Sequence, residues 1–312
     1  MAKVRTAVVG VGHQGKWHAE KFAALEDSDL VAVVDSDADR CGSLAEELNV
    51  KAITDFKDLI GEVDAVSIAS PTRSHFDIAS TLLENGIHVL VEKPITTTLE
   101  EAEALVELAE SRGLVLQVGH LERFNPAIMA LGEYLRKPQF IESNRIAPYK
   151  PRSTDVSVVL DLMIHDIDLV HSVVGSPVFN LDATGGSIIS NDIDIANARI
   201  KFENGCVANV TASRAGFKTE RSLRVFQANA YFNVDMHNRT STIYQKAGDG
   251  PVMSPDDISV DKQSYGASDA LMVQSEAFLS SIAGGPPPLV TGRIGMQALK
   301  TALDIGKMLT SA

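Results

Sequence analysis

The first 120 residues alternate short apolar runs with longer stretches of helical spacing. The apolar runs, rich in β-branched residues, span 4–9, 30–35, 65–69, 88–92 and 114–119. Between them, apolar positions recur every three or four residues over 16–25, 37–48, 74–85 and 98–112. Asp37 and Ser74 are expected N-caps, and Gly86 and Gly113 are expected C-terminal glycines. This alternation predicts an α/β domain, residues 1–120, built on a doubly wound parallel sheet.

After residue 120 the expected strands follow one another closely. They lie at 139–147, 181–186, 193–202, 206–213, 222–227, 231–235 and 240–245. The turn Glu203-Asn204-Gly205 between two of them indicates a hairpin. Helices are expected at 125–135, 155–174, 269–282 and 293–309, and residues 248–266 are expected to form a loop. We predict a second domain, 121–312, of α+β type on a mostly antiparallel, open-faced sheet, with helix 293–309 packing back on the first domain.

A glycine-rich turn joins the first strand to the first helix. Gly10 permits a tight turn, Gly12 lets the backbone approach a pyrophosphate, and Gly15 lets the helix pack closely on the strand. The helix N-terminus offers unpaired N–H groups to phosphates. Asp35 ends the second strand, about 20 residues after Gly15, where a carboxylate can bind ribose hydroxyls. Together these features predict a Rossmann domain that binds a dinucleotide.

Ligands of such sheets bind beyond the carboxyl ends of the strands, so the residues that follow each strand are the candidate cofactor contacts. They are Gly10, Gly12, His13, Gln14, Gly15, Asp35, Ser70, Pro71, Thr72, His75, Glu92, Lys93 and Pro94. The alternatives are an ordinary turn capped by Ser74 at 70–75 and a solvated charged turn at 92–94. The carboxylate of Asp35 repels a 2′-phosphate, so NAD is the expected cofactor, with NADP less favoured but kept open by Ser36 and Arg40.

The helix expected at 155–174 carries acids and histidines in an otherwise apolar stretch. Asp161 and His165 are four residues apart and share a helix face, which Asp168 also shares. Buried charges are costly unless they are paired or used, and a carboxylate beside an imidazole suits a general base near neutral pH. The alternatives are a helix whose charges all face water and a metal site. No clear third metal ligand follows, so no metal is predicted.

The candidate substrate contacts lie where the two domains should meet and in a basic loop. They are His120, Arg123, Asn125, Arg145, Lys150 and Arg152. Arg145, Lys150 and Arg152 cluster in an acidic protein, and they form either a clamp for a phosphorylated substrate or a merely solvated loop. A surface salt bridge is the alternative for Arg123.

The composition narrows the partners and the compartment. A net charge of −13 argues against nucleic acid and anionic membranes as partners. Cys41 and Cys206 form no CxxC motif, and we expect neither a signal peptide nor a transmembrane span, so a reducing, cytoplasmic location is expected. An exposed face of the second sheet would be a candidate surface for self-association.

These motifs resemble the Gfo/Idh/MocA family of sugar and cyclitol oxidoreductases. The resemblance rests on GVGHQG at 10–15, on Glu92-Lys93-Pro94 and on the Asp161-x-x-x-His165 helix. It implies bound NAD or NADP and a homodimer or homotetramer. It also implies a catalytic set of Lys93, Asp161 and His165. His165 would accept a hydroxyl proton while a hydride leaves the same carbon, Asp161 would orient His165, and Lys93 would hold the substrate hydroxyl.

Within the family, residues 119–126 and 151–169 are similar to UDP-N-acetylglucosamine 3-dehydrogenases. This resemblance implies oxidation of the sugar 3-hydroxyl of a nucleotide sugar, whose diphosphate the basic loop would suit. One alternative is a dehydrogenase of myo-inositol or another free sugar, which would not need that loop. A second is a non-catalytic, nucleotide-binding regulator, against which the intact set of Lys93, Asp161 and His165 argues.

Overall fold

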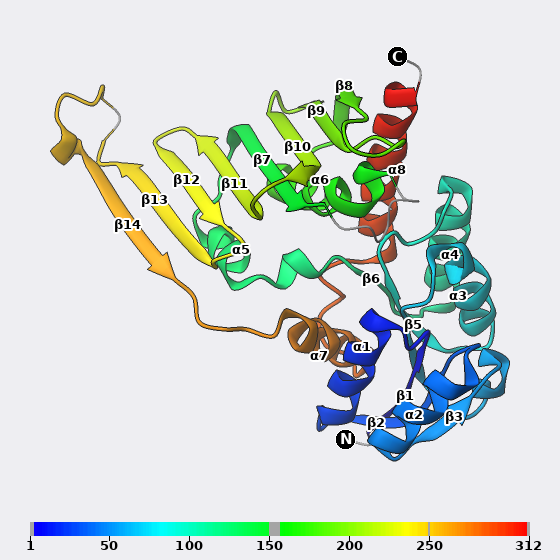
Figure 1. Ribbon diagram of the computed structural model, residues 1–312. Helices are drawn as coiled ribbons and strands as arrows, with labels where there is room; N and C mark the ends of the chain where they lie inside the picture. The colour runs from blue at the N-terminus through cyan, green and yellow to red at the C-terminus, as the bar shows by residue number, and fades with distance from the viewer. Residues whose placement is uncertain (1–2, 150–156, 249, 311–312) are drawn as a thin grey trace. The chain divides into compact units, whose positions relative to one another are not determined.

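The structure is a computed structural model that describes residues 3–149, 157–248 and 250–310 (Figure 1). It divides into two compact units, which we describe separately. Unit 1 comprises Met1–Leu121 and Asp269–Leu299, and unit 2 comprises Glu122–Ser268 and Lys300–Ala312. In the described part of the chain, no helix is both long enough and apolar enough to cross a bilayer.

Unit 1 is built on a six-stranded parallel sheet with the order β3-β2-β1-β4-β5-β6. The strands are β1 Val4–Val9, β2 Ser28–Val34, β3 Lys51–Ile53, β4 Ala65–Ile68, β5 His88–Glu92 and β6 Leu116–Gly119. The helices are α1 His13–Ala24, α2 Ala38–Leu48, α3 His75–Glu84, α4 Leu99–Arg112, α7 Ala270–Ile282 and the first part of α8 Gly292–Thr310. The strand order reverses between β1 and β4, where such sheets open a binding crevice. The predicted doubly wound sheet is confirmed.

Local signals set the ends of the helices in unit 1. Thr98 and Glu101 form a capping box at the start of α4, which ends at Gly113 with φ of 63°. Asp37 caps α2 by accepting from Arg40 N. Ser74 occupies the predicted N-cap position of α3, but its side chain makes no cap hydrogen bond, because its hydroxyl donates to Pro71 O three residues earlier. Strand β3 was not expected because three residues are too short for a readable pattern.

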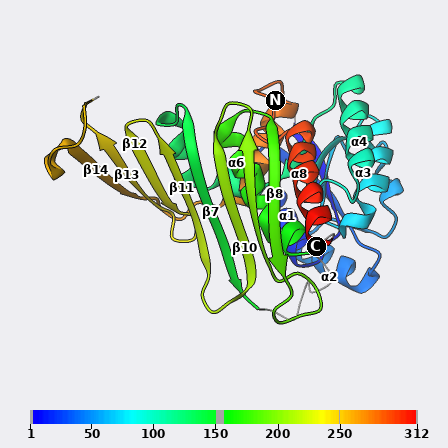
Figure 2. The ribbon, with the colours of Figure 1, turned by 90° about the horizontal axis from the view of Figure 1, so that it is seen from above.

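Unit 2 is built on an eight-stranded sheet with the order β14-β13-β12-β11-β7-β10-β9-β8 (Figure 2). Its strands are β7 Pro138–Pro148, β8 Val178–Gly186, β9 Ile195–Phe202, β10 Val207–Gly216, β11 Glu220–Gln227, β12 Ala230–Asp235, β13 Thr240–Lys246 and β14 Ile258–Ser264. Neighbours pair antiparallel except β7 with β10. Its helical segments are α5 Pro126–Met129, a π-helical turn Val159–Met163, α6 Ile164–Val174 and the end of α8. The mostly antiparallel α+β prediction is confirmed.

Two predicted elements of unit 2 are wrong. The expected loop 248–266 contains β14, which pairs antiparallel with β13. Most side chains of β14 are exposed on both of its faces, and only Ile258 and Val260 in it are apolar, which is too short a pattern to indicate a strand. The helix expected at 125–135 is only Pro126–Met129, followed by the 3₁₀ turn Ala130–Glu133.

One face of the unit 2 sheet is covered and the other is open. Alternate residues such as Ile141, Val210 and Val225 are buried on the side that α6 covers. The opposite face carries a row of aromatic rings across four strands. These are Phe140, Phe226, Tyr231 and Tyr244, with successive ring centroids 5.8, 4.6 and 5.3 Å apart.

Candidate active site

The turn between β1 and α1 has the geometry of a phosphate cradle. Gly10 has φ of 84°, and a Cβ there would lie 2.5 Å from Ser70 N. A Cβ at Gly15 would lie 1.7 Å from Gly10 O, so helix and turn can approach only because both residues are glycine. At Gly12, by contrast, the nearest atom to an added Cβ is Arg40 Nη1 at 3.9 Å. The backbone is therefore crowded behind the turn and open at Gly12, as a pyrophosphate contact requires.

Asp35 stands at the end of β2 beside this turn. Its Oδ2 accepts from Val11 N at 2.9 Å and its Oδ1 accepts from Asp37 N at 3.0 Å. Arg40 Nε lies 3.6 Å from Oδ2. A cavity of about 300 Å³ opens next to the carboxylate, lined by residues that include Gly10, Asp35, Ser36, Phe56, Ser70 and Pro71. The structure thus brings the predicted adenosine-side residues together at one sheet edge, with an acid placed to bind a ribose.

His75 has a different role from the predicted cofactor contact. Its side chain is 1% exposed, with Nδ1 2.9 Å from Pro94 O and Nε2 2.8 Å from Ser70 O. Burial lowers the pKa of His75 despite these two carbonyl oxygens. Both ring nitrogens are engaged with the backbone, so the ring ties the loop after β4 to the loop after β5.

Lys93 follows β5 at the same sheet edge, and its peptide bond to Pro94 is cis. The preceding side chain, Glu92, is directed toward α1 within unit 1. Glu92 Oε1 lies 3.0 Å from His18 Nε2 of α1, and Glu92 Oε2 accepts from Lys93 N at 3.2 Å. The sequence analysis missed His18, although a histidine between the buried Gly15 and Phe22 on one helix face is a detectable signal. His120 follows β6 and is buried.

In unit 2, Asp161 and His165 lie in consecutive helical segments. Asp161 belongs to the π-helical turn and His165 to α6, and both are partly exposed. A separation of four residues is close to one turn of either helix type, so the two side chains stay on one side. Asp168 does not share that exposure, because it is buried and accepts from Arg123 Nε at 2.8 Å.

The predicted substrate contacts of unit 2 are mostly engaged inside the unit. Arg145 is 3% exposed, donates from Nη1 to Glu122 Oε1 at 2.9 Å and pairs through Nε with Asp166. Asn125 caps α5 and donates to Met236 O at 3.0 Å. The structure therefore contradicts an open phosphate clamp at Arg145, because its charge is neutralised by two carboxylates. Lys150 and Arg152 lie outside the described residues.

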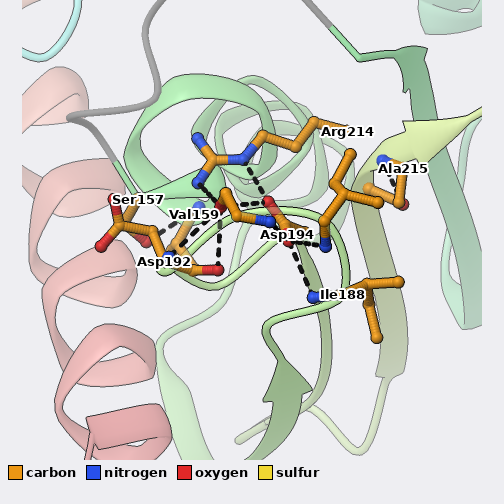
Figure 3. A network of polar contacts seen from close by, with 10 residues as sticks. Ser157, Val159, Ile188, Asp192, Asp194, Arg214 and Ala215 are labelled. Carbon is orange, nitrogen blue, oxygen red and sulfur yellow. Dashed lines mark hydrogen bonds and ion pairs between the residues drawn. The ribbon is translucent and has the colours of Figure 1, made fainter. Parts of the chain in front are cut away.

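A second cavity in unit 2 lies beside the π-helical turn. It has a volume of about 360 Å³ and mostly apolar walls that include Val159, Leu160, Ile193, Ala302 and Leu303. Asp194 organises the loop at its rim (Figure 3). Its buried carboxylate accepts from three successive backbone amides, those of residues 188–190, at 2.7–2.9 Å and from Arg214 Nε at 2.9 Å. The rim is therefore fixed by a fully bonded acid instead of by apolar packing.

No group of three His, Cys, Asp or Glu side chains suited to a metal ion occurs among the residues that the structure describes. The site is instead built for a dinucleotide, on the evidence of the glycine cradle and of Asp35.

Comparisons with known proteins match both units. The model of an oxidoreductase family with an NAD-binding Rossmann fold matches residues 4–120, and the C-terminal domain model of the same family matches residues 138–232. A UDP-N-acetylglucosamine 3-dehydrogenase of Acidithiobacillus ferrooxidans is 40% identical over 310 residues, 98% of this chain and 97% of that protein. A solved structure of that enzyme superposes with a TM-score of 0.93 at 38% identity, covering 100% of this chain and 99% of that chain.

Two further relatives act on cyclitols. A scyllo-inositol 2-dehydrogenase (NAD(+)) of Bacillus subtilis is 30% identical over 232 residues, 68% of each chain. The structure of scyllo-inositol dehydrogenase from Lactobacillus casei with bound NAD(H) and scyllo-inositol has a TM-score of 0.83 at 21% identity, covering 99% of this chain and 97% of that one, and shares the fold. The predictions of family, fold and NAD as cofactor are confirmed. This chain therefore belongs to the Gfo/Idh/MocA family of NAD-binding oxidoreductases.

Proposed function

We propose that this enzyme oxidises the 3-hydroxyl of UDP-N-acetylglucosamine to a ketone, with NAD as the hydride acceptor. The observation that carries the proposal is the similarity to the Acidithiobacillus ferrooxidans enzyme over nearly the whole of both chains. The cavity beside Asp35 and the open backbone at Gly12 supply the cofactor side of the site.

Lys93, Asp161 and His165 are the proposed catalytic residues. NAD, when bound, would supply the nicotinamide C4 that accepts the hydride. The base His165 would take the proton of the substrate hydroxyl, so that alcohol and NAD⁺ would give ketone, NADH and one proton. Asp161 holds the imidazole of His165 in the orientation of an acceptor. Lys93 donates to the substrate oxygen and stabilises the charge that develops on it.

The diphosphate contact falls to Lys150 and Arg152, since Arg145 is engaged with Glu122 and Asp166. Removing both charges, by Lys150→Met with Arg152→Met, should raise KM for a UDP-sugar and leave KM for NAD unchanged. An unchanged KM for the UDP-sugar would contradict this assignment.

A cyclitol dehydrogenase is the second candidate, favoured by the 30% identical Bacillus subtilis relative. NADH formation at 340 nm with UDP-N-acetylglucosamine and with myo-inositol separates the two. The assay should include glutamate and a 3-keto-sugar aminotransferase, which withdraw the ketone if the equilibrium is unfavourable. Turnover of the UDP-sugar alone supports the proposal, and turnover of inositol alone contradicts it.

We also propose a cytoplasmic homodimer or homotetramer that associates through the open face of the unit 2 sheet. The support is the row formed by Phe140, Phe226, Tyr231 and Tyr244, because a continuous aromatic patch on a sheet face is costly in water. Tyr231→Lys should shift the mass measured by light scattering toward the monomer. The control Glu103→Lys changes an exposed residue of α4 in unit 1, away from this sheet, and should leave the mass unchanged.

A further inference from the structure

A chain of polar side chains runs through the core of unit 1 to the backbone of Lys93. Ser67 of β4 places Oγ 2.8 Å from Nδ1 of His18, whose Nε2 lies 3.0 Å from Oε1 of Glu92. The other oxygen of Glu92 accepts from the backbone N–H of Lys93 at 3.2 Å. His18 is 0% exposed and Ser67 is 1% exposed, whereas the Glu92 side chain is 13% exposed, so the group runs from the core toward the surface.

The bonding pattern fixes which atom carries the proton. Burial would raise the pKa of Glu92, but the bond from His18 and the charges of His18 and Lys93 outweigh it, and the pKa is lowered. Glu92 is therefore an ionised carboxylate that can only accept, so His18 Nε2 must carry a hydrogen. Nδ1 of the same ring lies 2.8 Å from the Ser67 hydroxyl, so both ring nitrogens of His18 have a partner.

The side chain of Glu92 is surrounded by three elements of unit 1. It stands at the end of β5, contacts His18 of α1, and lies against Gly119 of β6, where an added Cβ would come within 2.8 Å of Oε1. Stability alone does not require such an arrangement, because apolar side chains of similar volume fill a core at lower cost than a buried charge. This series of hydrogen bonds ends at the backbone of Lys93, which indicates that it serves to position that residue.

The residue after Lys93 is also held in place. The ring nitrogens of His75 lie 2.9 Å from Pro94 O and 2.8 Å from Ser70 O. Glu92 and Pro94, the two neighbours of Lys93, are therefore each bonded to a buried histidine. His18, His75 and Lys93 are the titratable groups that act on Glu92 or sense its charge. No acid other than Glu92 takes part in the bonds described here.

We propose that His18 is a positioning residue for Lys93. Through Glu92 it fixes the direction of the Lys93 backbone and keeps the Glu92 carboxylate beside that residue. The catalytic consequence rests on the proposed role of Lys93, whereas the effect on the position of Lys93 does not.

The direct test measures the reactivity of Lys93 in the full-length protein without substrate. Acetylation by a water-soluble acetylating reagent is followed against pH by mass spectrometry in wild type, His18→Phe and His18→Gln. In His18→Phe, Glu92 loses its bond to the ring and its carboxylate is no longer held beside Lys93, so Lys93 should be labelled about tenfold faster near neutral pH. His18→Gln keeps an amide donor toward Glu92 and should restore the wild-type curve. Lys57, an exposed lysine, should label equally in all three proteins.

Activity supplies the second readout. His18→Phe should lower kcat by roughly 10- to 100-fold through misplacement of Lys93, with the KM for NAD nearly unchanged and with rescue by His18→Gln. If Lys93→Met keeps full activity, the proposed function fails, and the labelling result still judges His18. A labelling curve that does not move in His18→Phe overturns the proposal, even if kcat falls. If His18→Phe does not fold, Ser67→Ala replaces it and should move the curve in the same direction by a smaller amount; an unmoved curve there overturns the proposal as well.

Discussion

In unit 1 the buried polar side chains converge on the edge of the sheet that binds the cofactor, whereas in unit 2 they close on one another as ion pairs. Unit 1 holds His18 against Glu92 and His75 against two carbonyls, next to Lys93. Unit 2 instead buries the pairs Arg123–Asp168, Arg145–Asp166 and Arg214–Asp194. A charged residue near a candidate site is therefore weak evidence for ligand binding until its partner is known.

The largest effect should come from the proposed base of unit 2. His165→Asn should lower kcat/KM for the sugar by about 10²- to 10⁴-fold, since it removes the proton acceptor. Unfolding by urea should be nearly unchanged, because His165 is partly exposed. The matched control is His237→Asn, at an exposed histidine of the same unit. Equal activity of the two variants would refute the role of His165.

Arg145 should matter for stability and not for substrate affinity. Arg145→Met leaves Asp166 without its cation, so the free energy of unfolding should fall by about 3–5 kcal/mol. The control Arg224→Met breaks the exposed pair with Glu142 and should cost at most about 1 kcal/mol. The opposite pattern, a raised KM for the UDP-sugar in a protein of normal stability, would restore Arg145 to the substrate clamp.

Features that depend on local sequence could be predicted, whereas contacts between distant residues could not. The bounds of β1 and β5 match the predicted 4–9 and 88–92, because continuous apolar runs between turn residues mark buried strands. The glycine cradle was predictable because its chemistry depends on the backbone and on local spacing. The partners of Arg145 were not predictable, because Glu122 and Asp166 lie 23 and 21 residues away and only the fold brings them together.

His171 should give unit 2 a stability that depends on pH. Burial lowers its pKa to about 4, although Asp168 opposes the shift, while Arg123 and Lys300 add to it. The unfolded chain takes up a proton below its ordinary value of 6.5, and the folded chain does so only near 4. Stability should therefore be complete above about pH 6.5 and fall as pH drops toward 4, by at most about 3 kcal/mol.

Urea unfolding of wild type and of His171→Leu between pH 7 and pH 4 isolates the contribution of His171 to the pH dependence of stability. The free energy of unfolding of wild type should fall relative to that of His171→Leu as the pH falls, since the leucine variant lacks the titrating group. A difference that stays constant over this range would show that His171 is not held neutral.

The smallest effect should be the change in cofactor preference. Asp35→Ser removes the charge that repels a 2′-phosphate while Arg40 stays nearby, so the ratio of kcat/KM for NADP to that for NAD should rise by about tenfold. Asp37→Ser, which removes the other acid that pairs with Arg40, should change the ratio less. No change in Asp35→Ser would remove the assigned role of Asp35.

The central claim, transfer of a hydride from sugar C3 to NAD, is tested most directly with labelled substrate. UDP-N-acetylglucosamine that carries deuterium at C3 is incubated with the enzyme and NAD, with the aminotransferase and glutamate present, and the reduced cofactor is analysed by mass spectrometry. Hydride transfer from C3 should give reduced cofactor that is one mass unit heavier, and substrate deuterated at C4 should give unlabelled cofactor. Unlabelled cofactor from the C3-deuterated sugar, in a reaction that still forms NADH, would rule out transfer from C3.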